Sequence, residues 1–275
     1  MILFEKHKKL RYTYGSLGRE ATNMHQPSEH EMLLTRALDL GEQMLLRGAE
    51  VGRVEDTLTR ILRSQGATRV DVFTITSSMV VTAQWADGPV TQTRRISGIQ
   101  YDMTALTRLN ALSREICAGG CSMETVGQRL EEIARGKTYS FPFTILIYGF
   151  TSLVFSLFFG GSWLDAAISA GIGLLSRLML RLMERLQVPG IASILLCAIL
   201  GGFVAHGLAY LGVPCAPDKV AIGDIMLLVP GIAMTNAIRD MFTGDTISGL
   251  LRFCESLLLS LALAWGFALP SALFL

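Results

Sequence analysis

A broken apolar segment near the end of the chain carries the residues whose types and spacing best suggest chemistry. Within residues 227–250, Pro230 and Gly231 interrupt the apolar run, and polar side chains follow the interruption. These polar side chains are Thr235, Asn236, Arg239, Asp240 and Asp245. A proline inside a helix leaves the carbonyl four residues earlier, here that of Met226, without a donor, and lipid supplies no replacement. We therefore expect a broken membrane helix whose interruption faces protein or a water-filled cavity, as in the discontinuous helices that carry transporter sites.

Further ionisable residues lie inside or beside the neighbouring apolar segments: Asp165, His206, Asp224, Arg252 and Glu255. Each such group costs about 2.5–3.5 kcal/mol to insert into a membrane, so each is a candidate for function. Asp165 is expected to cap a helix start, and His206 can take up a proton near neutral pH. Arg252 and Glu255 are three residues apart, close enough to pair on one helix face. The broken helix predicts, with Thr235, Asn236, Asp240 and Glu255, a polar cavity between the fourth and fifth membrane spans. Apart from Asp165, the polar and ionisable residues named above are candidates for a substrate or proton pathway, as are Pro230 and Gly231.

Sequence motifs give no support for an enzyme, a metal site or a cofactor site. The chain holds neither H-E-x-x-H nor G-x-S-x-G. Gly136-Lys137-Thr138 lacks the first glycine of a phosphate-binding loop, because Glu131 stands at that position. The five cysteines are not spaced as a zinc site, and a net charge of +1 gives no basic stripe for nucleic acid. We expect no catalytic residues, no cofactor, no metal and no nucleic-acid partner.

The charged residues are concentrated in the first half of the chain. Of the 24 Lys and Arg residues 18 precede residue 141, as do 16 of the 23 Asp and Glu residues. The whole chain is nevertheless 51% hydrophobic, with a mean hydropathy of +0.44. This segregation predicts a mobile tail over residues 1–29, a cytoplasmic α+β domain over 30–140, and a transmembrane domain over 141–275.

Periodicity indicates the elements within the polar half. Apolar residues recur at helical spacing from Glu31 to Gln65, with a break near Gly48, so we expect two helices there. Three β-rich runs with turn signals between them predict an antiparallel meander over Arg69–Thr76, Met79–Trp85 and Val90–Ile96. Two more helices, started by Asp and Ser caps, are expected over Asp102–Cys117 and Ser122–Arg135.

In the apolar half, five runs approach the length that spans a membrane, near residues 142–160, 162–183, 190–212, 222–237 and 247–269. The basic residues of the short loops fall mainly on one side, with Lys219 by itself on the other. Those on the first side are Arg177, Arg181, Arg185, Arg239 and Arg252. The positive-inside rule then predicts a cytoplasmic N-terminus and a periplasmic C-terminus. The basic tail residues Lys6, Lys8, Lys9 and Arg11 are expected to rest on the membrane surface.

Several segments resemble the bacterial threonine/serine exporter family. They read EQMLLRGAEVGRVEDTLTRIL, VDVFTITSSMVVTA and EEIARGKTYSFP in the first half, and LLVPGIAMTNAIRDMFTGDTISGLLRF in the second. The resemblance is to the longer component of the family, which has a cytoplasmic domain and five spans. It implies export of small hydrophilic metabolites, linked in members to threonine and serine and, in two-component versions, to dicarboxylates such as succinate.

The resemblance also implies a partner. Some members fuse this unit to a second hydrophobic half, which this chain does not show. A separate small four-span membrane protein of the same family is therefore the expected partner, in an oligomeric assembly surrounded by membrane lipid.

Residues and resemblance together predict a subunit of a secondary exporter in the bacterial inner membrane, which moves a small carboxylate-bearing solute outward at the expense of the proton gradient. The half-helix N-terminus at Pro230-Gly231 suits a substrate carboxylate, with Arg239 or Arg252 as its supplement. Candidates for carrying the coupling proton are Glu255, Asp240 and His206. The alternative is a non-transporting membrane protein whose N-terminal domain senses a ligand or recruits a partner while its spans anchor it.

Overall fold

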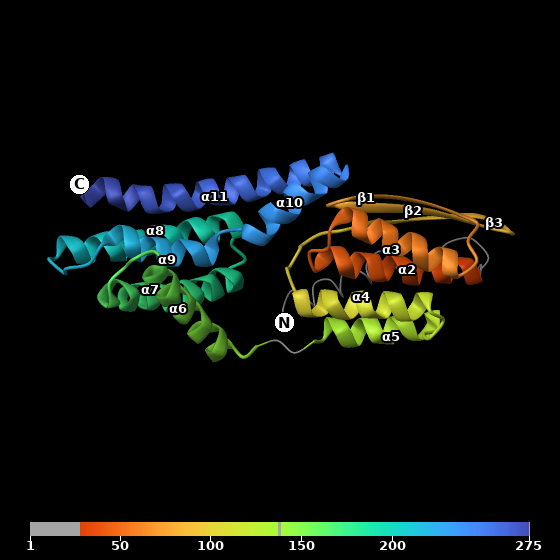
Figure 1. Ribbon diagram of the computed structural model, residues 1–275, viewed down its shortest axis with the longest axis horizontal. Coiled ribbons are helices and arrows are strands. Elements are labelled where there is room, and N and C mark those ends of the chain that lie inside the picture. The colour runs from red at the N-terminus through yellow and green to blue at the C-terminus, as the bar shows by residue number, and fades with distance from the viewer. Residues whose placement is uncertain (1–27, 137–138, 275) are drawn as a thin grey trace.

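The computed structural model describes residues 28–136 and 139–274. Two parts lie end to end: an N-terminal domain and a bundle of long helices (Figure 1). Most of the expected tail, including its four basic residues, lies outside the described residues. The predicted fold class, a helical membrane protein with an N-terminal α+β domain, is confirmed.

The N-terminal domain has three layers (Figure 1). A three-stranded antiparallel sheet, ordered β1-β2-β3, is covered on one face by α2 and α3, and α4 and α5 cover those helices in turn. The elements are α2 Glu29–Leu46, α3 Val51–Ser64, β1 Arg69–Ile75, β2 Ser78–Trp85, β3 Gly88–Arg95, α4 Met103–Cys117 and α5 Met123–Ala134. Their bounds lie within about two residues of the expected ones.

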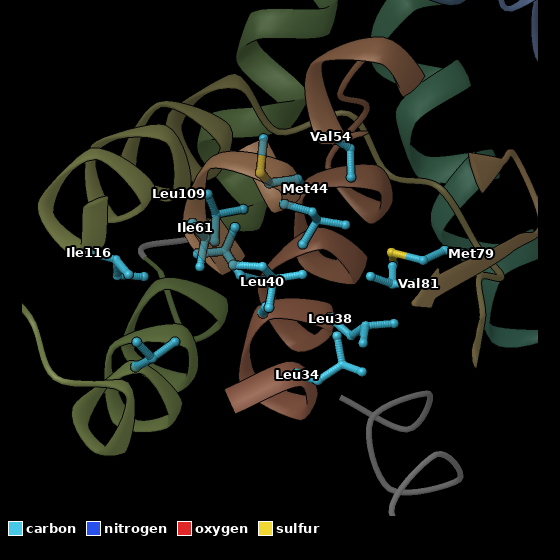
Figure 2. Close-up of a cluster of buried hydrophobic side chains, with 14 of the residues drawn as sticks. Leu34, Leu38, Leu40, Met44, Val54, Ile61, Met79, Val81, Leu109 and Ile116 are labelled. Atoms are coloured by element: carbon cyan, nitrogen blue, oxygen red, sulfur yellow. The ribbon is translucent and has the colours of Figure 1, made fainter. Parts of the chain in front are cut away.

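The core of this domain forms where the apolar faces of sheet and helices meet. Along β2 every second residue is buried, from Met79 to Trp85, as expected for a strand with one face against helices. Figure 2 shows Leu38 and Met44 of α2 in this cluster, near Met79 and Val81 of β2. Helix α2 begins at a capping box in which Ser28 and Glu31 satisfy each other's backbone N–H groups.

The membrane bundle contains α6 Phe141–Phe158, α7 Trp163–Arg185, α8 Gly190–Tyr210, α9 Pro217–Leu228, α10 Gly231–Thr243 and α11 Thr246–Phe274. Four of these helices, α6, α7, α8 and α11, are long and apolar enough to cross a membrane, and α9 with α10 forms a fifth candidate span bent by 56°. The chain is thus a multi-pass membrane protein.

The fourth span differs from its expected range of 222–237. Its helices cover residues 217–228 and 231–243, because Pro217 is tolerated in the first turn of α9 and Gly244, with a φ of 101°, ends α10. Asp224, expected at the outer start of this span, therefore lies two turns inside α9.

Helix α11 is longer than a bilayer requires. Its 29 residues extend about 43 Å at 1.5 Å per residue, against a ~30 Å hydrocarbon core. Its first turns and α10 project from the bundle as a hairpin that reaches the N-terminal domain (Figure 1).

Candidate functional site

The chain changes direction at Pro230, where α9 ends and α10 begins. Val229 adopts an extended conformation, and the Gly231 N–H donates to the Val229 carbonyl over 2.8 Å. The next helical bond runs from the Met234 N–H to the Pro230 carbonyl, so α10 starts afresh in a new direction. The break thus aims α10 at the N-terminal domain.

The side of the α10–α11 hairpin meets the turn between α2 and α3, residues 47–50, which we call the junction loop. Asn236 Nδ2 donates to the Gly48 carbonyl over 3.2 Å, and Arg252 Nη2 donates to the Ala49 carbonyl over 3.0 Å. Gly48 has a φ of 87°, and a Cβ there would collide with the ring of Tyr101. A glycine is therefore needed for the loop to present its carbonyls in this way.

A buried ion pair supports this contact. Arg252 Nη1 lies 3.1 Å from Asp240 Oδ2, and the two side chains are only 2% and 1% exposed. The charges neutralise each other across the α10–α11 hairpin, while the Arg252 guanidinium also binds the junction loop. Removing either partner would leave an uncompensated charge in a buried site.

Two further acidic groups lie around the start of α3. Glu50, its N-cap residue, pairs with Arg239 of α10 at 2.9 Å, an exposed contact. Asp245 Oδ2 lies 3.0 Å from the position that a Cβ on Gly52 would occupy, beside the first turn of α3. Because a helix N-terminus carries partial positive charge, the Asp245 carboxylate suits this position. A small cleft of about 150 Å³ runs beside it, between residues 73–75 of β1 and residues 244–248.

The structure brings together only some of the residues that the sequence singled out. Five of them meet at the junction with the N-terminal domain: Asn236, Arg239, Asp240, Asp245 and Arg252. The remaining candidates lie apart from them, as follows.

Thr235 is exposed and donates to the carbonyl of Gly231 in its own helix. His206 Nδ1 lies 3.1 Å from the Gly202 carbonyl, also in its own helix. Glu255 is exposed, and Arg252, which is close enough in sequence to pair with it, turns toward Asp240 instead. Asp224 is buried within the bundle, beside Ser176.

The residues of the junction loop are not among the candidates that the sequence indicates. Their position was predictable, because the segment RGAEVG lies at the break between two expected helices. Spacing along the chain gives no sign that its carbonyls meet Asn236 and Arg252, which follow by 188 and 203 residues.

A second, larger cleft of about 700 Å³ opens between α3 and α4 on the N-terminal domain. Three arginines contribute to its walls: Arg53, Arg60 and Arg114. Arg60 pairs with Asp56 in the same cleft, so the net charge of these four groups is positive.

Comparison with known proteins finds similar sequences. A family model described as "Putative threonine/serine exporter" matches residues 36–274. The "Probable succinate transporter subunit YjjP" of Klebsiella aerogenes is 24% identical over 243 residues, which are 87% of this chain and 93% of that protein. The "Threonine/serine exporter" of Corynebacterium glutamicum is 22% identical over 190 residues, 66% of this chain and 38% of that protein.

A fungal relative matches over nearly the whole chain. "Pheromone-regulated membrane protein 10" of Pichia sorbitophila is 23% identical over 278 residues, which cover 98% of this chain. The chain spans 27% of the length of that protein and 34% of its counterpart from Eremothecium gossypii. No solved structure matches.

Proposed function

The chain belongs to the threonine/serine exporter family, and from this premise we propose that it is a subunit of a proton-driven exporter of small carboxylate-bearing metabolites. Threonine, serine and dicarboxylates such as succinate are the solutes that its relatives' names suggest. We place it in the bacterial inner membrane, with the N-terminal domain in the cytoplasm and the C-terminus in the periplasm. A separate four-span membrane protein of the family completes the exporter, as the word "subunit" in one relative's name suggests.

The observation that carries this proposal is the junction between the broken span and the N-terminal domain. A bent membrane helix whose polar end is held by a soluble domain can change direction when that domain moves. In this proposal the junction acts as the inner gate. Asn236, Asp240 and Arg252 hold it closed, and release of the junction loop opens the cytoplasmic end of the pathway.

The charges at the gate fit an anionic solute. When the junction loop leaves, Arg252 loses its Ala49 acceptor and Arg239 loses Glu50. The Arg239 guanidinium can then bind a carboxylate in a bidentate manner, and Arg252 Nη2 offers one further donor while its Nη1 stays beside Asp240. The N-terminus of α10 at Pro230-Gly231 lies further along the same helix and favours the same charge.

Efflux from preloaded cells tests the function. Three kinds of cells are loaded with labelled threonine, serine or succinate: cells that produce this chain, cells that produce the chain and its four-span partner, and cells that produce neither. We expect efflux of one solute class with the pair, stopped by collapse of the proton gradient. Absence of efflux in every combination, with both proteins present in the membrane, would reject the exporter assignment.

A second function, ligand sensing by the N-terminal domain, is favoured by the arginine-bearing cleft between α3 and α4. Its positive charge suits an anionic metabolite. This is tested by calorimetric titration with succinate of the full chain in detergent, with the variant R53A/R114A as control. Saturable binding to the wild-type protein that the variant lacks would support ligand sensing. Equal heats of binding for both proteins would reject it.

A further inference from the structure

The interface of α6, α7 and α9 buries a row of polar side chains inside the membrane bundle. Asp224, Ser152, Ser156, Ser169 and Ser176 are all fully buried. Asp165, which is 4% exposed, ends the row in the first turn of α7, where it accepts the Ala216 N–H over 2.7 Å. This end of α7 lies on the side of the bundle away from the N-terminal domain (Figure 1). Eleven residues of α7 separate Asp165 from Ser176, which is about 16 Å along the helix. Ser176, and Asp224 beside it, therefore lie near the middle of α7.

Asp224 is held by neutral groups. Ser176 Oγ donates to its two oxygens at 3.2 and 3.4 Å, and the Cys197 thiol of α8 donates to the Ser176 carbonyl. None of the ion pairs in residues 28–136 and 139–274 includes Asp224. A carboxyl buried without a cation favours its protonated, neutral form, because an isolated charge is costly in a low dielectric.

The charged and titratable side chains around Asp224 are few. Cys197 approaches it from α8, and α11 contributes the apolar ring of Phe267. On α7 the nearest cation is Arg177, which pairs with Glu184 at 3.3 Å and lies over the ring of Tyr148 from α6. Arg177 is thus engaged elsewhere, and Asp224 keeps no fixed counter-ion.

Two hydroxyls in the row have no partner. Ser152 Oγ and Ser156 Oγ are buried on α6 and form no hydrogen bond with the described residues. Ser169 Oγ lies next to them, donating to the Ser152 carbonyl over 3.1 Å. An unpartnered buried hydroxyl costs about 1–3 kcal/mol, so small residues chosen only for packing would favour alanine here. The hydroxyls indicate a route for something that forms hydrogen bonds.

The packing around the row decides what can pass. A Cβ on Gly223 would meet Ser169 Oγ and the Ser152 carbonyl, and one on Gly201 would lie 2.8 Å from Asp224 Oδ2. Helices that approach this closely leave no space for an amino acid or a dicarboxylate. A proton, which moves along hydroxyls by exchange of hydrogen bonds, needs none.

We propose that Asp224 is the carboxyl that carries the coupling proton, and that Asp165, Ser156, Ser152 and Ser169 form its access from the side of the bundle away from the N-terminal domain. In each cycle the Asp224 carboxylate gains one proton from that side, forming an O–H bond. The bond breaks when the proton leaves on the other side. This inference rests on the proposed function for its direction, since export driven by the proton gradient requires protons to enter from outside.

The variant D224N tests the carrier. Purified chain and partner in vesicles are measured in two modes: efflux of labelled solute driven by a pH gradient, and exchange of labelled for unlabelled solute without a gradient. We expect D224N to lose driven efflux by roughly 100-fold or more, since an amide carries no proton, and to keep exchange. Driven efflux equal to wild type, or loss of both modes at equal abundance, would overturn the proposal.

The variants S152A and S156A test the route. Each removes a hydroxyl without a partner, so folding is unharmed, and each should slow driven efflux while leaving exchange intact. S193A is the matched control, because Ser193 is also buried but donates to the Pro189 carbonyl of its own helix. Equal driven efflux in S152A, S156A and S193A would overturn the assigned route.

Infrared spectroscopy tests this inference independently of the proposed function, because it needs no transport assay. At neutral pH the wild-type chain should show the C=O stretch of a protonated buried carboxylic acid, which is missing in D224N and present in S193A. Identical spectra for wild type and D224N would overturn the inference even if the exporter is confirmed. If the band is present but none of the tested solutes is exported, the protonated Asp224 is supported and the proposed function is not.

Discussion

At the scale of single residues, burial distinguishes two ion pairs that join α10 to its surroundings. Arg252 and Asp240 are almost completely buried, whereas Arg239 is 58% exposed beside Glu50. Both arginines were equal candidates in the sequence. Burial makes one of them a structural requirement and leaves the other as a weak surface contact.

The substitution R252A should therefore destabilise the protein far more than R239A. Losing one partner of a buried pair costs about 3–5 kcal/mol, and an exposed pair contributes about 0–1 kcal/mol. Thermal unfolding of the purified variants, with protease sensitivity of the junction loop as a second readout, measures the difference. Equal losses in the two variants would contradict the burial argument.

Glu55 gives the junction a pH dependence. Burial raises the pKa of Glu55 above its ordinary 4.5, the N–H of Thr74 lowers it in part, and the Asp245 carboxylate raises it further. An acid with a raised pKa in the folded state stabilises the fold below its unfolded pKa, and this contribution is lost as pH rises through the folded pKa. Stability from this group should thus fall as pH rises above 4.5.

The variant E55Q tests this sign. Glutamine stays neutral and still offers an oxygen to the Thr74 N–H, so E55Q should raise the melting temperature at pH 8 by roughly 1–3 °C and by less at pH 4.5. E132Q, at an exposed position on α5, controls for the loss of one negative charge. A difference between E55Q and wild type that is the same at both pH values would contradict the linkage.

At the scale of elements, the bend between α9 and α10 follows from one missing donor. Proline at position 230 cannot bond the Met226 carbonyl, so α9 ends and α10 begins at an angle of 56°. The small residues of the bundle have the opposite effect. They draw α6, α7 and α9 together so closely that α9 stays fixed while α10 is left with contacts mainly to α11.

The substitution P230A should straighten the fourth span, because alanine restores the N–H for the Met226 carbonyl. Spin labels at Lys219 and Thr243 would then lie further apart than in wild type. P217A is the matched control, since a proline in the first helical turn removes no helical bond. An unchanged distance in P230A would show that packing against α11, and not the proline, sets the bend.

At the scale of the whole molecule, the described part of the membrane bundle meets the N-terminal domain through the α10–α11 hairpin, which contacts the turn between α2 and α3 (Figure 1). A movement of the domain would therefore act on α10, the half of the broken span that contacts it.

Locking the junction should stop efflux. In a chain lacking the exposed or partly exposed Cys117, Cys121, Cys215 and Cys254, E50C and R239C would be joined by a cleavable bismaleimide. Efflux of the labelled solutes should fall on cross-linking and return on cleavage. E131C/R135C, which replaces an ion pair at the C-terminal end of α5, is the matched control. Unchanged efflux in the locked protein would show that the junction is a static support.

Much of this architecture could be predicted from the sequence. Apolar runs of bilayer length give membrane helices because unpaired backbone groups are excluded from lipid. Alternating residues give the meander, and Asp and Ser caps mark the helix starts. The ends of the fourth span were harder, because Pro217 and Asp224 look like a boundary until the helix geometry is known.

What the sequence by itself determined is local: which segments are helices, strands or spans, and where the fourth span breaks. These follow from periodicity, capping and the chemistry of proline, all of which act within a few residues. Only the tertiary structure decided that Arg252 faces Asp240 and Ala49, that Glu255 is left exposed, and that Asp224 lies among serines without a cation. Such neighbours are 12 to 203 residues apart along the chain, and their contacts depend on how closely the helices pack.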